Sequence, residues 1–303
     1  MASYFFYCQK GYAKAKFEAS SPWMILTVFL ICGCGSFPVT KVAVDNKNSV
    51  ENEAIKLLPV LPSKYELSIP PFYIFSDRPI RITESLSKSV IDLRDSVLKV
   101  LKIPLPKSVI FVYLFGEKGS FDHYLEKKYP NLPSRRAFFV AQGKTGNRDE
   151  DLLVFTWWSD KIELDLRHEL THALIHSSFP SMPLWIDEGL AELFELDLYP
   201  SLLRDRAKEA LVDFAKVDGP NIKRLEAIKS IHQMGREEYR EALCWAHWFL
   251  NGDKRARDVF YSFLTDLKIM KESSLHLKIS AAFQDCNVKM KEHVGNVMVQ
   301  SKP

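Results

Sequence analysis

The chain has 303 residues, of which 47% are hydrophobic and 12% aromatic, so it can bury a substantial core and is not a solvated, disordered tail. The formal charge is +3, and Lys10, Lys14, Lys16 and Glu18 together contribute +2, which leaves +1 for the residues after position 33. This balance, with no basic stripe and no recognised nucleic-acid motif, excludes nucleic acid as an expected partner.

The first 33 residues have the pattern of a bacterial lipoprotein signal peptide. A basic leader precedes an apolar run of about a dozen residues starting at Trp23, which is too short for an ordinary membrane-spanning helix. The run ends in Leu-Ile-Cys-Gly before Cys34, which resembles a lipobox. We therefore expect export, cleavage before Cys34 and lipid attachment to it, so that the protein is anchored to a membrane of the cell envelope. The alternatives are a plain signal peptide without lipidation and an uncleaved anchor, the latter because no charged residue interrupts residues 19–40.

Residues 34–68 are expected to be a tether between the membrane and the folded domain. They contain Pro38, Pro59 and Pro62 and a polar, charged stretch at 45–53.

The cysteines give no sign of a structural zinc site, because none of the five forms a C-x-x-C pair. Export would place Cys244 and Cys286 in an oxidising compartment. They could form a disulfide there, but the sequence does not show whether they meet.

The folded domain is expected over residues 69–300, with strands in its first half and helices in its second. Apolar, β-branched and aromatic runs predict strands at 71–75, 109–115, 137–141 and 152–156. The polar segment 142–151 predicts a hairpin loop. Apolar periodicity predicts helices over 82–101, 120–128, 162–177 and 184–196, and helices throughout 202–298. The fold class is therefore α+β, a small mixed β-sheet with covering helices followed by a helical C-terminal lobe.

The central motif is His168-Glu169-Leu170-Thr171-His172, an H-E-x-x-H pattern inside the predicted helix 162–177. On a helix the two imidazoles lie on one face at i and i+4, where both can bind one Zn²⁺ ion. Glu169 projects about 100° around the helix axis, so it can reach a zinc-bound water without binding the metal itself. These positions predict His168 and His172 as metal ligands and Glu169 as the catalytic general base.

A third metal ligand is expected from Glu188, which follows His172 by sixteen positions across a proline-marked turn. The next helix can fold back over the zinc there, and Gly189 admits a close approach of the two helices. Three protein ligands leave the fourth position of a tetrahedral zinc open to water, which is typical of a catalytic site. The alternative is a pair of histidines that are hydrogen-bonded to carboxylates and bind no metal.

Glu192 is the first candidate for the outer support of the centre. It lies at i+4 from Glu188 on the same helix face, where it can accept the second N–H of a ligating histidine and fix its tautomer. Asp187 and Asp165 are alternatives for this role, and Glu192 could also be a surface glutamate.

The pattern His-Glu-Leu-Thr-His followed by Leu-Trp-Ile-Asp-Glu-Gly-Leu-Ala-Glu at 184–192 resembles the gluzincin metallopeptidases, in particular exported bacterial members. Their third ligand is the glutamate of a Trp-x-x-Glu-Gly-x-Ala-type segment. The resemblance implies a zincin-like domain, a zinc-bound water with a glutamate base, and a β-hairpin edge along which an extended peptide binds, here 137–141 or 152–156. The fifteen residues between His172 and Glu188 are fewer than in the aminopeptidase-like members, which leaves the subsites open.

Such enzymes need a donor for the oxyanion of the tetrahedral intermediate. Tyr239, His232 and His247 are the candidates, and Tyr239 is preferred because it begins a predicted helix much as relatives place a tyrosine after the ligand helix. Trp157 and Trp158 either line the cleft or pack in the core.

The favoured function is zinc-dependent hydrolysis of a peptide bond in a peptide or protein substrate. The alternatives are a catalytically silent zinc-binding envelope lipoprotein that acts as a scaffold, an amidase for a non-peptide or cell-wall amide, and simple zinc storage.

Overall fold

The computed structural model describes residues 60–130, 132, 134–143 and 150–300, which fall in one unit of the chain. The predicted signal peptide, the lipidation site Cys34 and most of the predicted tether lie outside these residues. Within the described part, no helix has the length and apolar character needed to cross a membrane.

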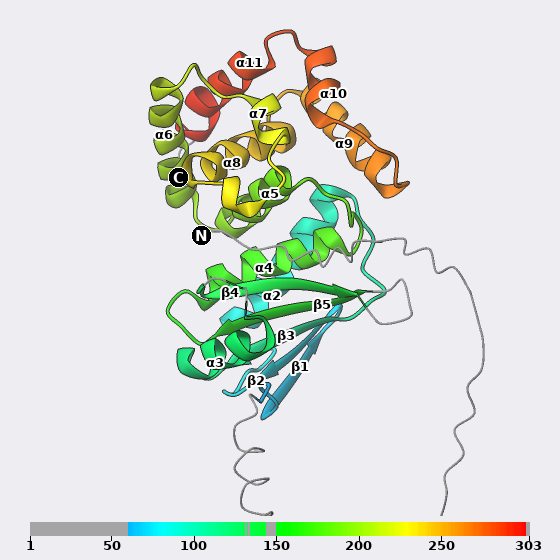
Figure 1. Ribbon diagram of the computed structural model, residues 1–303, viewed down its shortest axis with the longest axis vertical. Helices are drawn as coiled ribbons and strands as arrows, with labels where there is room; N and C mark the ends of the chain where they lie inside the picture. Colours follow the sequence, from blue (N-terminus) through cyan, green and yellow to red (C-terminus); the bar gives the residue numbers. More distant parts are fainter. Residues whose placement is uncertain (1–59, 131, 133, 144–149, 301–303) are drawn as a thin grey trace, which may run out of the picture. The chain divides into compact units, whose positions relative to one another are not determined.

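A five-stranded mixed sheet forms the first half of this unit (Figure 1). Its spatial order is β1-β2-β3-β5-β4. The strands are β1 (Tyr65–Ile69), β2 (Phe72–Ser76), β3 (Ile110–Phe115), β4 (Ala137–Gly143) and β5 (Glu150–Trp157). The three inner strands β2, β3 and β5 run parallel, and the edge strands β1 and β4 are antiparallel to their neighbours.

Four of the five strands were predicted from the sequence, and the fifth was not. The β4–β5 hairpin has the predicted antiparallel pairing, and of its two strands β4 is the one at the edge. The fifth strand, β1, begins at Tyr65, so residues 65–68 belong to the sheet and not to the tether. The sequence did not predict β1 because this edge strand is mostly exposed and carries no continuous apolar run.

The two faces of the sheet are covered by different helices. Alternate residues of the inner strands, such as Ile74, Val112 and Val154, pack with α2 (Ser85–Leu101) and α4 (Ile162–His176) in one core. The opposite face packs through Phe138 and Phe155 against α3 (Lys118–Lys128). Because α2 and α3 lie within the crossovers that parallel strands require, the alternation of helix and strand in the sequence builds both layers.

The second half is helical. It contains α5 (Leu184–Leu196), α6 (Pro200–Lys216), α7 (Ile222–Glu226), α8 (Arg236–Asn251), α9 (Lys254–Lys268), α10 (Leu275–Ala282), α11 (Cys286–His293) and a final turn at Val294–Met298. Helix α4 contacts strands β4 and β5 on one side and α5 on the other, and α5 packs in turn against α8 (Figure 1). The helix that carries the H-E-x-x-H motif therefore joins the sheet to the helical half.

Cys244 and Cys286 do not pair. Both are buried, Cys244 on α8 and Cys286 at the start of α11, and both are free thiols. The disulfide that export would permit is therefore not formed between them.

Gly189 allows a close approach of helices, but the neighbour differs from the predicted one. We expected it to face the metal helix, whereas it faces α8. A Cβ at this position would lie 2.4 Å from the carbonyl oxygen of Ala242 and 3.2 Å from its Cβ. The backbone of α5 thus rests directly on α8, because no side chain intervenes.

We predict that Gly189→Ala destabilises the fold by about 1–3 kcal/mol, since the new methyl group overlaps a backbone carbonyl that cannot move without shifting α8. Denaturant unfolding measures the change. Gly119→Ala in α3 is the matched control, because its Cβ meets no atom within 4 Å, and it should be neutral or stabilising by up to about 1 kcal/mol. Equal stability of the two variants would contradict this account of the α5–α8 contact.

Candidate metal centre

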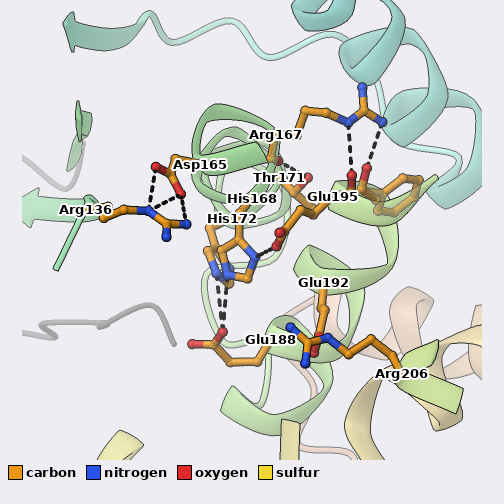
Figure 2. A network of polar contacts seen from close by, with 11 residues as sticks. Arg136, Asp165, Arg167, His168, Thr171, His172, Glu188, Glu192, Glu195 and Arg206 are labelled. Atoms are coloured by element: carbon orange, nitrogen blue, oxygen red, sulfur yellow. Dashed lines mark hydrogen bonds and ion pairs between the residues drawn. The ribbon is translucent and has the colours of Figure 1, made fainter. Parts of the chain in front are cut away.

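Two histidines of α4 and one glutamate of α5 converge on a single buried point (Figure 2). Glu188 Oε2 lies 3.5 Å from His168 Nε2 and 3.7 Å from His172 Nε2. One ligand atom from each of the three residues falls within 4.8 Å of the others. The sequence-predicted ligands His168, His172 and Glu188 are therefore brought together by the fold.

The inward-facing atoms of this cluster have the bonding pattern of a metal site. Nε2 of both histidines and both carboxylate oxygens of Glu188 are buried and make no hydrogen bond of normal geometry. Leaving a buried carboxylate without hydrogen bonds is costly, unless a cation supplies the missing interactions. Two imidazole nitrogens and one carboxylate are a donor set that zinc prefers, so the residues present fit a zinc ion.

Two further carboxylates hold the outer nitrogens of the histidines. His168 Nδ1 lies 2.8 Å from Glu195 Oε2, and His172 Nδ1 lies 3.0 Å from Asp187 Oδ2 (Figure 2 shows the Glu195 contact). Each carboxylate can accept an Nδ1–H, so that in the neutral imidazole the proton is on Nδ1 and the lone pair of Nε2 is directed at the cluster.

The prediction that Glu192 accepts the second N–H of a ligating histidine is wrong. Its Oε1 pairs with Arg206 Nε at 3.2 Å, and Glu195, one turn further along α5, contacts His168 instead. Of the two alternatives, Asp187 has the predicted role toward His172, while Asp165 pairs with Arg136 at 2.7 Å. Glu195 was missed, although its place at i+7 from Glu188 puts it on the same helix face and could have indicated it.

Arg167, the residue before His168, holds the end of α5 in the position from which Glu195 reaches His168. Its guanidinium is almost completely buried and donates to the carbonyl of Phe194 at 2.7 Å and to that of Glu195 at 3.4 Å (Figure 2). It also donates to the carbonyl of Ser89 on α2 at 3.2 Å. The carbonyls of Phe194 and Glu195 belong to the last turn of α5, where no intrahelical donor remains. Arg167 therefore fixes the end of α5 beside His168.

The carboxylates change the proton affinity of the ligands. Burial lowers the pKa of His168, but its contacts with Glu188 and Glu195 outweigh burial and hold the pKa well above its usual range. Burial also lowers the pKa of His172, and Asp187 and Glu188 reverse this shift. Because a metal binds only unprotonated imidazole, protons compete for the site and metal binding weakens as the pH falls.

The catalytic candidates Glu169 and Tyr239 are both buried near this centre. Glu169 lies on α4 between the ligands, close enough for its charge to raise the pKa of His168. Tyr239 lies in the first turn of α8, and its side chain is buried. Burial raises the pKa of Tyr239 far above its ordinary value of 10.0, the Glu188 carboxylate adds to the rise, and the Arg135 guanidinium opposes it.

The other aromatic and histidine candidates lie in different surroundings. His232 is exposed in a short 3-10 turn at Ile231–Gln233. Trp158 packs against the sheet core and donates from Nε1 to Ser76 Oγ at 3.0 Å, and Trp157 packs against the core under α3. His247 is buried against His293 of α11, with His247 Nδ1 2.8 Å from His293 Nε2. Of the three candidates for oxyanion donor, the structure therefore brings Tyr239 near Glu188.

Comparison with known proteins gives little further guidance. No family model and no curated protein matches the chain. Among solved structures it is similar to an M1 zinc metallopeptidase from Deinococcus radiodurans, with 13% sequence identity and a TM-score of 0.40. The likeness covers 80% of this chain and 53% of that one, so the chain spans about half the length of that protein. Function therefore has to be inferred from the residues of the centre.

We predict that Glu195→Gln weakens zinc binding by about 10–100-fold, because His168 loses the charged acceptor that orients its ring. Chelator competition at fixed pH measures the zinc dissociation constant. Glu192→Gln is the matched control, since Glu192 also lies on α5 but pairs with Arg206 of α6 and not with a histidine. The zinc affinity of this variant should stay within a few-fold of wild type. A larger loss for Glu192→Gln than for Glu195→Gln would reverse the assignment.

The His247–His293 pair predicts a pH dependence of stability that is separate from the metal centre. Burial lowers the pKa of both residues to about 4, and His293 adds to the shift at His247. The unfolded chain therefore binds more protons than the folded chain between the ordinary value of 6.5 and about 4, so this pair makes the protein lose stability as the pH falls through that window.

Replacing His293 with leucine should make the free energy of unfolding fall less steeply between pH 6.5 and pH 4. Denaturant titrations across this range measure the slope for both proteins. The metal-site histidines contribute equally to both, so the difference isolates the pair. Identical slopes would show that the two rings are not buried as neutral imidazoles.

Proposed function

We propose that the chain is a zinc-dependent peptidase with a zincin-like catalytic domain. The observation that carries the proposal is the convergence of His168, His172 and Glu188 on one buried point, with Glu169 between the two histidines on the same helix. A site built only to hold zinc would be completed by a fourth protein ligand and would have no use for a buried glutamate beside the metal.

The metal, when bound by these three side chains, would lower the pKa of a water in its open position and polarise the scissile carbonyl. Glu169 would accept the proton that the attacking water loses and pass it to the leaving nitrogen. Its burial on α4 between the two histidines supports this role, because it places the carboxylate beside the position that the water would occupy.

Tyr239 would donate a hydrogen bond to the oxygen on which negative charge develops. Its raised pKa keeps the hydroxyl protonated throughout the physiological range, so it is available as a donor. A donor that is held by packing in the first turn of α8 needs no reorganisation during the reaction, which is the condition for effective electrostatic stabilisation.

The substrate would bind as an extended strand along β4. This strand ends the sheet, and an edge strand offers backbone N–H and C=O groups to a peptide. Helix α4 contacts β4, and the Arg136–Asp165 ion pair joins the start of β4 to α4 three residues before His168. A peptide on this edge would therefore be held in a fixed relation to the metal ligands.

We further propose that the enzyme works at the surface of an exporting cell and is tethered by a lipid on Cys34. The support for this is the lipobox-like sequence and the proline-containing segment that precedes the folded domain. Peptides or proteins of the cell envelope would then be its substrates.

The decisive experiment is metal analysis and peptide-library cleavage with the wild-type chain and Glu169→Gln. We predict that the variant keeps zinc, because Glu169 is not a ligand, and loses turnover by about 100-fold or more. Unchanged turnover in Glu169→Gln would show that Glu169 is not the general base. Full zinc occupancy with no peptide cleaved by the wild type would favour the scaffold, and cleavage of muropeptides without cleavage of peptides would favour a cell-wall amidase.

A further inference from the structure

A third histidine continues the ligand row on α4. His176 follows His172 at i+4, the spacing that separates His172 from His168, so the three imidazoles lie along one helix face. His176 is buried, and its Nε2 lies 3.2 Å from Asp187 Oδ2. The same oxygen is 3.0 Å from His172 Nδ1, so one carboxylate oxygen joins a metal ligand to a residue outside the ligand set.

The direction of these hydrogen bonds follows from the chemistry of the partners. His172 presents Nε2 to the ligand cluster, so its proton is on Nδ1 and is donated to Asp187. An ionised carboxylate accepts only, so His176 also donates, from Nε2. The other oxygen, Asp187 Oδ1, is buried and makes no hydrogen bond, so both donors hold the same end of the carboxylate.

The ring of His176 is itself held by the sheet. Phe139 on β4 packs against His176 with ring centroids 5.4 Å apart and against His172 at 6.3 Å. Phe139 is almost completely buried, so neither imidazole can turn freely. The orientation of the Nε2–H of His176 is thus fixed by packing against β4.

We propose that His176 is a positioning residue of the metal centre, which holds Asp187 in the orientation that fixes the tautomer and ring plane of His172. With His176 in place, turning the carboxylate of Asp187 breaks two hydrogen bonds at once. Without His176, the Nδ1–H of His172 is the single donor that restrains the carboxylate of Asp187, because Oδ1 makes no hydrogen bond. Asp187 then holds the ring of His172 less firmly. The inference rests on the zinc centre of the proposed function but not on peptide hydrolysis.

Two substitutions separate the hydrogen bond of His176 from its packing. His176→Phe keeps a flat ring beside Phe139 and removes the donor, whereas His176→Gln places an amide N–H near the position of Nε2 and removes the ring. Both are compared with the wild-type full chain by chelator competition for zinc and by the visible spectrum of the Co²⁺-substituted protein. We expect His176→Phe to weaken zinc binding by about 10-fold or more and to alter the Co²⁺ spectrum. His176→Gln should recover most of the affinity.

A double-mutant cycle with Asp187→Asn tests whether His176 acts through Asp187. If it does, His176→Phe should change the zinc affinity much less in the Asp187→Asn background than in wild type. Thermal unfolding of the metal-free variants shows whether each has folded. If His176→Phe has not, His176→Leu, which also removes the donor, takes its place in the affinity measurement and in the cycle.

Three results would overturn the inference: wild-type zinc affinity and Co²⁺ spectrum in His176→Phe, an equal loss of affinity in His176→Gln and His176→Phe, or additive effects in the cycle. A wild-type chain that binds no zinc would overturn it together with the proposed function. A wild-type chain that binds zinc and cleaves no peptide would overturn peptidase activity alone, because every readout here is metal binding.

Discussion

The antiparallel pairing of α4 with α5 is the interaction on which the rest of the structure depends. It places the start of the motif beside the end of α5, so that Arg167 meets the carbonyl of Phe194 and His168 meets Glu195. One turn later along α4, and about two turns earlier along α5, His172 meets Asp187. A shift of this pairing by one turn would give each histidine a different carboxylate or none.

Helix α5 would be a poor core helix without these partners. Four of its buried side chains are carboxylates, namely Asp187, Glu188, Glu192 and Glu195. A buried charge is tolerated when it is paired, and here Asp187 is held by two histidines, Glu192 by Arg206 and Glu195 by His168. Glu188 is the member whose oxygens make no hydrogen bond, and it is the one that the histidine Nε2 atoms face. The electrostatics of α5 therefore favour a cation at that point.

The sheet and the helical half each contribute support from their own side. From the sheet, Phe139 packs against the histidine rings and Arg136 pairs with Asp165 of α4. From the helical half, the contact of Gly189 with Ala242 fixes α5 on α8, and Tyr239 lies one turn earlier on α8. The residues of the proposed chemistry thus come from three helices whose separations are set by packing, and this rigidity suits a site that must hold its geometry.

The sequence by itself determined the local parts of this protein. Apolar periodicity predicted the inner strands and the hairpin, and the spacing of His168, Glu169 and His172 on a helix fixed their faces, because helix geometry relates neighbouring residues without reference to the rest of the fold. Glu188 was found in the same way, from a motif and a turn. The strand β1 was not found, because an exposed edge strand carries no apolar run.

The tertiary structure alone decided how these parts pair. Glu195 supports His168 where Glu192 was expected, Gly189 faces α8 and not α4, and β4 and not β5 forms the edge of the hairpin. Cys244 and Cys286 stay apart, and His176 contacts Asp187. Each of these outcomes depends on the register between elements that are distant in the sequence. That register is set by the packing of whole helix faces, and no short stretch of sequence contains it.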